Sequence, residues 1–253
     1  MISKAKIKYI RSLELKKNRT AEGLFVAEGP KVVGDLMPTM RLRYVVATEN
    51  WLNTNHSKIP SGVEVFEVTE EELRKVSYLQ TPQEVLAVFE IPGCNSSAAT
   101  DFPKDKLSLA LDGVQNPGNL GTIIRIADWF GIENIYCSQD TADAYNPKVV
   151  QATMGSIARV NIIYTNITTL LTSLPANYPV YGTLLDGENI YAKQLTKHGI
   201  IVMGNEGNGI SQEVRKHVNN QLLIPNFATA ADKAESLNVA IATAITCSEF
   251  RRR

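Results

Sequence analysis

A glycine-rich turn that directly follows an apolar run is the part of this sequence best suited to bind a ligand. Residues 200–203 are all apolar, as in a buried strand, and the hexapeptide GNEGNG follows them at residues 204–209. Glycine has no side chain, so three glycines in one turn allow a ligand to approach the backbone closely. This pattern predicts a ligand site at the carboxyl end of a strand, although GxxGxG runs also occur in many ordinary turns.

A second loop of similar character lies further along the chain. Pro225 ends the apolar residues 222–224, and the tetrapeptide ESLN at residues 235–238 opens an apolar segment with helical spacing. Both loops could therefore face one pocket. Simpler explanations stay open, because Pro225 could merely end a strand and Ser236 could merely cap a helix.

A third segment, NPGNLGTIIR at residues 116–125, places Asn119 and Arg125 six positions apart. Alone, Arg125 would be interpreted as a surface charge on an amphipathic helix. Together, however, the three segments stand in the order and near the spacing of the three motifs of the SpoU/TrmH group of RNA methyltransferases. The sequence resembles that family strongly, over roughly residues 107 to 250.

The resemblance implies methyl transfer from S-adenosylmethionine to a ribose 2'-hydroxyl of structured RNA. Ribosomal RNA is the favoured substrate, and the alternatives are transfer RNA or a non-catalytic RNA-binding or ribosome-assembly factor on the same fold. The reaction needs a pocket for the cofactor, an aligned hydroxyl group and a way to manage the hydroxyl proton. By resemblance, the cofactor would be held by residues from several loops: Thr183, Leu184, Gly204, Gly207, Ile224 and Leu237.

Five polar side chains carry the chemistry in this interpretation: Asn119, Arg125, Glu206, Ser236 and Asn238. In the family an arginine matching Arg125 is proposed to activate the 2'-hydroxyl, but a guanidinium group stays protonated at neutral pH and is a poor base. We therefore expect Arg125 to clamp a substrate phosphate and to stabilise the developing alkoxide. By resemblance, Glu206 would orient the arginine or the cofactor's amino groups, and Ser236 and Asn238 would hold the arginine or the ribose.

The segments that must position these residues alternate between strand and helix signals. They are residues 107–111, 120–130, 134–137, 147–154, 160–164, 180–185, 200–203, 222–224 and 237–250. Such alternation predicts an α/β fold, with a mostly parallel sheet and helices on both faces, whose ligands bind beyond the carboxyl ends of the strands. The resemblance adds a deep trefoil knot formed by the C-terminal segment, a feature too rare for any sequence pattern to indicate.

The first part of the chain predicts a smaller α/β domain at residues 1–91, followed by a linker at 92–106 and the methyltransferase domain at 107–253. Strand signals at 24–27, 44–47, 63–68 and 85–91 alternate with helix signals at 30–36 and 70–78. The linker combines proline, glycine and polar residues without periodicity. Residues 8–33, which include Arg19, Glu28 and Gly29, resemble the RNA substrate-binding domain often found before this catalytic domain. That domain's fold is similar to a kink-turn-binding ribosomal protein.

Basic residues gather at the start of the chain. Residues 1–20 contain seven lysines and arginines against one glutamate, with apolar residues at helical spacing, and this pattern predicts one basic amphipathic helix. The helix could simply be solvated, or it could contact RNA phosphates, and both could hold at once.

Composition limits the class and location of the protein. Lys+Arg and Asp+Glu both number 26 in 253 residues, so the overall charge does not indicate nucleic acid. Three widely spaced cysteines indicate neither a disulfide framework nor a CxxC metal site, which suits a reducing cytoplasm. No apolar run approaches the length of a membrane span, and the N-terminal segment does not look like a signal peptide. We expect a cytoplasmic protein without a membrane anchor.

The sequence lacks the motifs that other enzyme classes require. GxGxxG does not follow residues 107–111 and GxxxxGK[ST] does not occur, which argues against dinucleotide and P-loop chemistry. The three histidines lie far apart, so no zinc site is expected and no metal is required. The resemblance predicts a homodimer, and so do apolar residues on more than one side of the last helix: Val239, Ala240, Ala242, Ala244 and Ile245.

Overall fold

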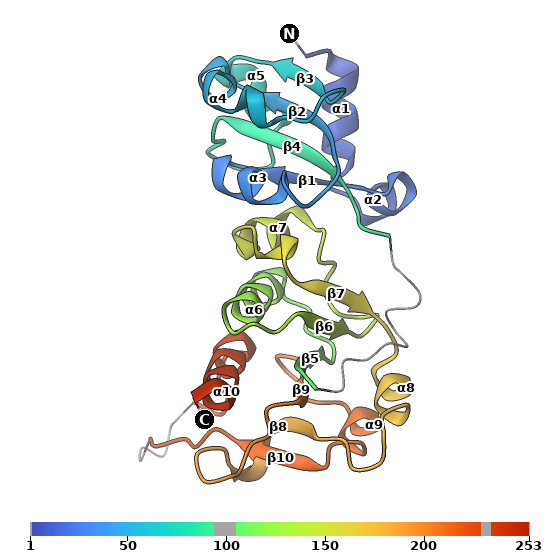
Figure 1. Ribbon diagram of the computed structural model, residues 1–253, viewed down its shortest axis with the longest axis vertical. Helices are drawn as coiled ribbons and strands as arrows, with labels where there is room; N and C mark the ends of the chain where they lie inside the picture. Colours follow the sequence, from blue (N-terminus) through green and yellow to red (C-terminus); the bar gives the residue numbers. More distant parts are fainter. Residues whose placement is uncertain (1, 94–104, 229–233, 253) are drawn as a thin grey trace. The chain divides into compact units, whose positions relative to one another are not determined.

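The computed structural model describes residues 2–93, 105–228 and 234–252, and it divides into two compact units (Figure 1). The first unit comprises Met1–Gly93 and Asp143–Ala158, and the second comprises Cys94–Ala142 and Arg159–Arg253. Much of the predicted linker, with Cys94, lies outside the described residues, as do residues 229–233. The segment Asp143–Ala158 therefore packs with the N-terminal unit, although it lies within the stretch predicted to form the methyltransferase domain.

The first unit is built on a mixed sheet that has four strands in the described residues. These are β1 (Leu24–Glu28), β2 (Leu42–Ala47), β3 (Glu64–Glu67) and β4 (Val85–Glu90), in the order β1-β4-β2-β3. β4 runs antiparallel to β1 and β2, whereas β3 runs parallel to β2. β1 therefore forms one edge of this sheet.

Helices cover this sheet because β1 and β4 carry buried, mostly apolar residues on both sides. Ile10 from α1 (Lys4–Ser12) and Leu73 from α5 (Glu70–Val76) share a core with Val26 and Val88 of the sheet. α3 (Pro30–Leu36) packs against β1 and β4, and α7 (Pro147–Thr153) packs against β1. α4 (Glu49–Asn55), which the sequence did not predict, follows β2. Burial of these apolar faces stabilises the unit.

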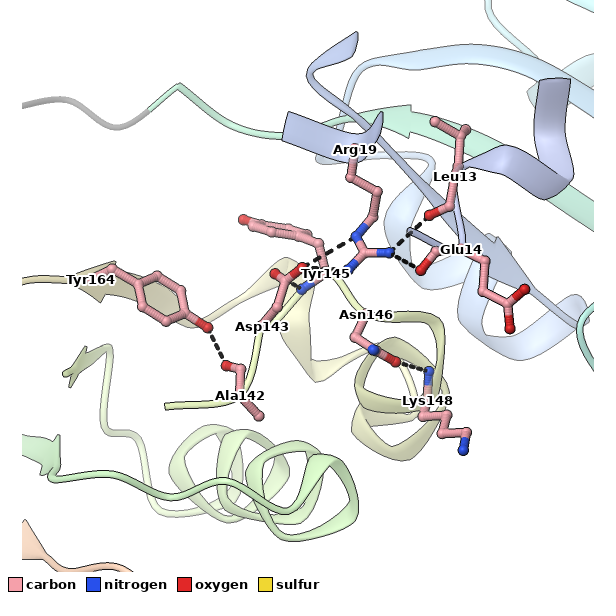
Figure 2. A network of polar contacts seen from close by, with 9 residues as sticks. All are labelled: Leu13, Glu14, Arg19, Ala142, Asp143, Tyr145, Asn146, Lys148 and Tyr164. Atoms are coloured by element: carbon pink, nitrogen blue, oxygen red, sulfur yellow. Dashed lines mark hydrogen bonds and ion pairs between the residues drawn. The ribbon is translucent and has the colours of Figure 1, made fainter. Parts of the chain in front are cut away.

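The N-terminal segment folds as two helices, so the prediction of a single helix over residues 1–20 is wrong. α1 ends at Ser12, and α2 (Lys16–Glu22) begins after a turn. Arg19 from α2 is only 2% exposed and donates hydrogen bonds to the carbonyl oxygens of Leu13 and Glu14, at 2.8 and 2.6 Å. Its guanidinium group thus satisfies the carbonyls of the turn that breaks the helix, and it pairs with Asp143 as well (Figure 2).

Three of the seven basic side chains in this region are already used within the unit. Lys6 pairs with Glu64 at 2.9 Å, and Arg11 donates to the carbonyl oxygen of Ser77 at 2.9 Å. Arg19 is the third. Lys4, Lys8, Lys16 and Lys17 remain exposed. A phosphate-contacting role in this region therefore depends mainly on four lysines.

The second unit contains a parallel sheet, as the alternating strand and helix signals predicted. Its six described strands are β5 (Leu107–Leu111), β6 (Asn134–Cys137), β7 (Asn161–Tyr164), β8 (Val180–Asn189), β9 (Gly199–Met203) and β10 (Asn220–Leu223), in the order β10-β8-β9-β5-β6-β7. All neighbouring pairs are parallel. β6 and β7 follow β5 on one side of it, whereas β9, β8 and β10 lie on the other side. The strand order therefore switches direction between β5 and β9.

Helices cover both faces of this sheet, which confirms the predicted α/β architecture. Leu170 from α8 (Ile167–Thr172) and Val214 from α9 (Gln212–Arg215) share a core with Ala110 and Val202. On the other face lie α6 (Pro117–Trp129) and α10 (Val239–Arg252), and the ring of Phe250 contacts Tyr181 at a centroid distance of 4.8 Å. Within the described ranges, no helix is both long enough and apolar enough to cross a membrane.

Helices α6 and α10 pack side by side in parallel and are joined at both ends (Figure 1). At their N-terminal ends, Asn238 donates to Asn119 at 2.9 Å. At their C-terminal ends, Arg251 donates to the carbonyl oxygens of Phe130 and Gly131, at 2.7 and 3.0 Å. The arginine thereby satisfies carbonyl groups just past the end of α6. The two helices together form one layer on this face of the sheet.

Candidate functional site

The motif loops lie at the same edge of the second unit's sheet. The turn that leads into α6 follows β5, the GNEGNG turn follows β9, and Ile224 follows β10. β5 and β9 are direct neighbours and run parallel, so their following loops leave the sheet side by side. Ligands of open parallel sheets bind in this position, where the order of the strands switches.

Glu206 joins the first two motif loops by hydrogen bonds. Its Oε1 accepts from the side-chain amide of Asn119 and from the backbone N–H of Asn116, each at 3.0 Å. Its Oε2 accepts from the backbone N–H of Gln115 at 3.2 Å. The sequence interpretation had Glu206 orienting the arginine or the cofactor. In the structure its carboxylate bonds to Asn119 and to backbone N–H groups at the start of α6, and the role expected from the resemblance stays a prediction.

The ionised form of Glu206 is favoured by these donors. Burial raises the pKa of this carboxyl, but the hydrogen bonds from Asn119 and from backbone N–H groups, including those of Asn116 and Gln115, outweigh that effect. The net result is a pKa below the usual value for glutamate. A fixed negative charge therefore sits next to the N-terminal end of α6, where the helix dipole favours it.

Asn238 joins the third motif loop to the same cluster. Its Nδ2 donates to Asn119 Oδ1 at 2.9 Å, and its Oδ1 accepts from the backbone N–H of Ala240 at 2.9 Å. The second contact caps α10, so the cap that the sequence allowed for Ser236 belongs to Asn238. Ser236 is exposed, and within the described residues its hydroxyl shows no hydrogen bond. The structure thus brings Asn119, Glu206 and Asn238 together and leaves Ser236 at the surface.

Gly204 and Gly207 differ in the space that a side chain would have. A Cβ atom at Gly204 would lie 2.2 Å from the backbone carbon of Gly209, so the turn itself closes too tightly for a side chain. A Cβ atom at Gly207 would meet only Asn205 Oδ1, at 3.6 Å. The intramolecular packing of the turn explains Gly204, whereas Gly207 is exposed and leaves its backbone accessible to a ligand.

Asn205 is a site residue that the sequence interpretation missed. Its Oδ1 accepts from the backbone N–H groups of Gly207 and Asn208, at 2.9 and 3.0 Å, and its Nδ2 donates to the carbonyl oxygen of Gly113 at 2.7 Å. The side chain thus fixes the glycine turn and ties it to the loop after β5. An asparagine directly before a Glu-Gly pair is a recognisable signal, because asparagine commonly bonds to the backbone two residues further on.

Thr183 and Leu184 lie where β8 departs from its neighbour β10. The register passes from Gly182 opposite Gln221 to Glu188 opposite Leu222, so the intervening residues of β8 are not paired with β10. Thr183 Oγ1 lies 3.4 Å from the carbonyl oxygen of Val202 and 3.6 Å from Met203 Sδ, at the end of β9. The excursion therefore places these two half-buried residues next to the strand that leads into the glycine turn.

The surroundings of these loops suit an adenosyl group. Ile224 is half-buried, Leu237 is exposed, and Phe227 after β10 is 80% exposed. Large apolar side chains exposed on loops at one sheet edge cost free energy in water and offer walls to an aromatic ring. With the accessible backbone at Gly207, the residues present fit a nucleoside cofactor held by apolar contacts and by backbone groups.

Arg125 stands apart from the hydrogen-bonded cluster. It lies on the exposed side of α6, six residues beyond Asn119, which corresponds to about 9 Å along the helix axis. Within the described part of the chain, its guanidinium group has no hydrogen bond or ion pair. The same exposed side carries Gly118, Thr122 and Trp129. Arg125 is thus available to an external anion and is not held by Glu206, Ser236 or Asn238.

The described residues contain no group of three or more histidine, cysteine, aspartate or glutamate side chains placed to hold a metal ion. Cys137 and Cys247 are buried thiols, and burial raises the pKa of both. Neither takes part in the cluster around Asn119.

Comparison with known proteins gives a consistent picture. The SpoU rRNA Methylase family matches residues 106–248, and the MRM3-like substrate binding domain matches residues 4–87. A 23S rRNA (guanosine(2553)-2'-O)-methyltransferase, RlmP, from Bacillus subtilis (strain 168) is 30% identical over 252 residues, with 97% of this chain and 96% of the relative covered.

Solved structures agree over the whole chain. A TrmH-family protein from Porphyromonas gingivalis is 42% identical, with a TM-score of 0.87 and coverage of 100% of this chain and 99% of that chain. An AdoMet-bound rRNA methyltransferase from Sinorhizobium meliloti is 32% identical, with a TM-score of 0.87 and coverage of 100% and 96%.

Proposed function

The chain belongs to the SpoU rRNA methylase family, and from this premise we propose that it methylates a ribose 2'-hydroxyl of ribosomal RNA with S-adenosylmethionine as the methyl donor. One observation carries the proposal. Three motif loops that are far apart in sequence are joined through Asn119, which bonds to Glu206 and to Asn238. This polar junction lies at the edge of the sheet where ligands of parallel sheets bind.

The cofactor would lie against the loops that follow β9 and β10 and against the excursion within β8. Thr183 and Leu184 would contact it from the excursion of β8, Gly207 would offer its backbone carbonyl oxygen, and Ile224 and Leu237 would cover the adenine ring. Gly204 would contribute indirectly, by allowing the turn to close. The bound cofactor supplies an electrophilic methyl group on a positively charged sulfur.

The protein's own groups would align the ribose and stabilise charge. Arg125 projects from the exposed side of α6 and would clamp a substrate phosphate through two parallel hydrogen bonds. The same cation would stabilise the alkoxide that develops as the 2'-hydroxyl loses its proton. Glu206 and Asn238 would act as positioning residues, because they fix Asn119 and the N-terminal ends of α6 and α10. Ser236, which is exposed beside this junction, would contact the ribose.

The first unit would capture the RNA. Lys4, Lys8, Lys16 and Lys17 are exposed on α1 and α2 and could neutralise phosphates. Ribosomal RNA is favoured over transfer RNA because a relative that matches nearly its full length is named as a 23S rRNA methyltransferase, and because residues 4–87 match a substrate binding domain. The trefoil knot and the cytoplasmic location stay predictions.

A second copy of the chain would pack against the C-terminal end of α6 and against α10. Trp129 is 84% exposed at the end of α6, and Ile241 is exposed on α10. An indole ring in water is unfavourable, and a homodimer would bury both side chains.

Transfer of a labelled methyl group from S-adenosylmethionine to purified ribosomal RNA and transfer RNA tests the function. We expect label in ribosomal RNA. Label confined to transfer RNA would support the alternative substrate, and tight RNA binding without any label would identify a non-catalytic RNA-binding factor.

A further inference from the structure

A cavity of about 340 Å³ opens on the first unit, away from the residues assigned to methyl transfer. Its lining comes from β1, from the segment after α5 and from α7, and it includes Val26, Glu28, Tyr78, Lys148, Val150 and Ala152. All of these residues belong to the first unit. The wall is mostly apolar with a few polar groups, which is the usual character of a small-molecule site.

The wall formed by α7 is held in place by the buried arginine described above. Arg19 donates to Asp143 through Nε at 3.2 Å and through a second, shorter contact, and Asp143 Oδ1 accepts from the backbone N–H of Tyr145 at 3.0 Å (Figure 2). Asn146 then caps α7 by accepting from the backbone N–H of Lys148 at 2.9 Å. This network fixes the start of α7 next to β1, so the cavity has a rigid wall.

Glu28 is the one carboxylate in the wall, and no step of the proposed methyl transfer uses it. It is 6% exposed and accepts from Ser77 Oγ and, at 2.9 Å, from the backbone N–H of Tyr78. A carboxylate has about four acceptor positions, so each oxygen keeps capacity for a further donor. Burial raises the pKa of Glu28, against the lowering effect of the hydrogen bonds from Ser77 and Tyr78.

We propose that this cavity binds one unstacked nucleobase with an exocyclic amino group, which donates to the carboxylate of Glu28. The proposal deepens the proposed function, because it names a recognition site for RNA. Proteins read single-stranded RNA by placing splayed-out bases against apolar and aromatic side chains and by hydrogen bonds to the base edges. Tyr78, Val26 and Val150 supply such walls, and the exposed Lys148 at the cavity would contact the attached phosphate.

The chemistry of the wall predicts which bases are accepted. A carboxylate accepts from the amino group of cytosine, adenine or guanine, whereas uracil presents a carbonyl oxygen where cytosine has its amino group. Cytidine and uridine therefore form a matched pair that differs at the atom facing Glu28. A good base contact of this type discriminates by about tenfold or more.

The test is a titration of the full chain with nucleoside 5'-monophosphates, followed through the methyl NMR resonances of Val26, Val150 and Ala152. We expect cytidine, adenosine or guanosine monophosphate to shift these resonances, with cytidine monophosphate binding at least about tenfold more tightly than uridine monophosphate if cytosine is the base that fits. Glu28→Gln should abolish the preference for the amino-bearing base, and Ala152→Leu should fill the cavity and weaken every nucleotide. Glu71→Gln, an exposed glutamate of the same unit, is the control and should change nothing.

Absence of shifts at these methyl groups with all the amino-bearing nucleotides would overturn the proposal, as would an unchanged base preference in a folded Glu28→Gln variant. The titration contains no S-adenosylmethionine. A protein that failed to methylate RNA would thus refute the proposed function without deciding the cavity, and the two results stay separate.

Discussion

The side-chain amide of Asn119 donates a hydrogen bond of 3.0 Å to Glu206, which lies 87 positions later in the chain. This bond connects the turn after β5 to the glycine turn after β9. Because Asn119 also accepts from Asn238, both ends of its carboxamide are occupied within the protein. We infer that Asn119 and Glu206 shape the site, whereas the substrate is contacted by other groups.

Replacement of Glu206 by glutamine should weaken methyl transfer more than cofactor binding. Glutamine keeps the size but has a single acceptor oxygen, and its amino group would face backbone N–H donors. We expect turnover to fall by about tenfold or more while the dissociation constant for S-adenosylmethionine stays within about threefold. Single-turnover kinetics and calorimetry measure the two effects. Equal losses in both would mean that Glu206 holds the cofactor.

The same carboxylate should give a pH signature. The pKa of Glu206 is lowered in the folded state, so the folded protein releases this proton more readily than the unfolded chain. Its contribution to stability is then fully present above the unfolded pKa and is lost as pH falls through the folded pKa. Thermal melting across roughly pH 3 to 6 should show a smaller acid loss for Glu206→Gln than for the wild type. Identical pH profiles would contradict this assignment.

The two glycines of the turn should separate folding from binding. Gly204→Ala places a Cβ atom against the backbone of Gly209 and should destabilise the protein by more than about 2 kcal/mol. Gly207→Ala has room in the free protein, so it should melt like the wild type but bind S-adenosylmethionine more weakly. Denaturation and calorimetry on both variants provide the comparison. A folded Gly207→Ala protein with unchanged affinity would place the cofactor elsewhere.

The parallel sheet could be predicted because its signals are local. Apolar runs alternate with helical periodicity, and carboxyl ends of parallel strands meet at one edge, so convergence of the motif loops followed from their positions. The hydrogen-bond partners could not be predicted. Glu206 bonds to Asn119 and not to Arg125. The partner depends on the shapes of two turns that are far apart in the sequence and meet only in the folded chain. The chemical roles assigned to these residues stay predictions.

The wrong prediction of one N-terminal helix has the same origin. The periodicity of residues 1–20 suits one helix, but Arg19 turns back to bond to Leu13 and Glu14 and so breaks it. No local sequence signal shows that Asp143, more than a hundred residues away, pairs with this arginine, or that α7 packs with the first unit. The sequence interpretation also missed three short helices, which are α4 in the first unit and α8 and α9 in the second.

Replacement of Trp129 by glutamate should disrupt the proposed homodimer. The wild type should scatter light as two chains, whereas the variant should approach the 27.9 kDa of one chain, because a carboxylate cannot be buried unpaired at the interface. Leu15→Glu, which changes an exposed apolar residue of the first unit, should leave the mass unchanged. A monomeric wild type at micromolar concentration would refute the dimer.

The exposed lysines of the first unit should set the salt dependence of RNA binding. Changing Lys4, Lys8, Lys16 and Lys17 to glutamine should weaken binding and flatten its dependence on salt, since fewer counterions are released. Lys58→Gln, another exposed lysine of this unit, serves as a single-site comparison. Cofactor affinity should be unaffected. An unaltered salt slope in the fourfold variant would exclude this surface as the RNA contact.

Arg125 should act in the transition state. Arg125→Ala should leave cofactor affinity nearly intact while turnover falls by roughly two powers of ten, the usual result of removing a preorganised charge. Lysine should rescue poorly, because a point charge cannot reproduce a planar two-pronged contact. If the rate of Arg125→Lys instead rose towards the wild-type rate with pH, general-base action would replace the clamp. A wild-type rate for Arg125→Ala would make this arginine a surface charge.

The central claim concerns the atom that receives the methyl group, and alkaline hydrolysis of the labelled product tests it most directly. Alkali cleaves RNA through attack by the free 2'-hydroxyl, so a nucleotide methylated at that oxygen survives within a dinucleotide. Ribosomal RNA incubated with the protein and methyl-labelled S-adenosylmethionine should release its label in an alkali-stable dinucleotide. Label found in mononucleotides would indicate base methylation, and this result would contradict the account.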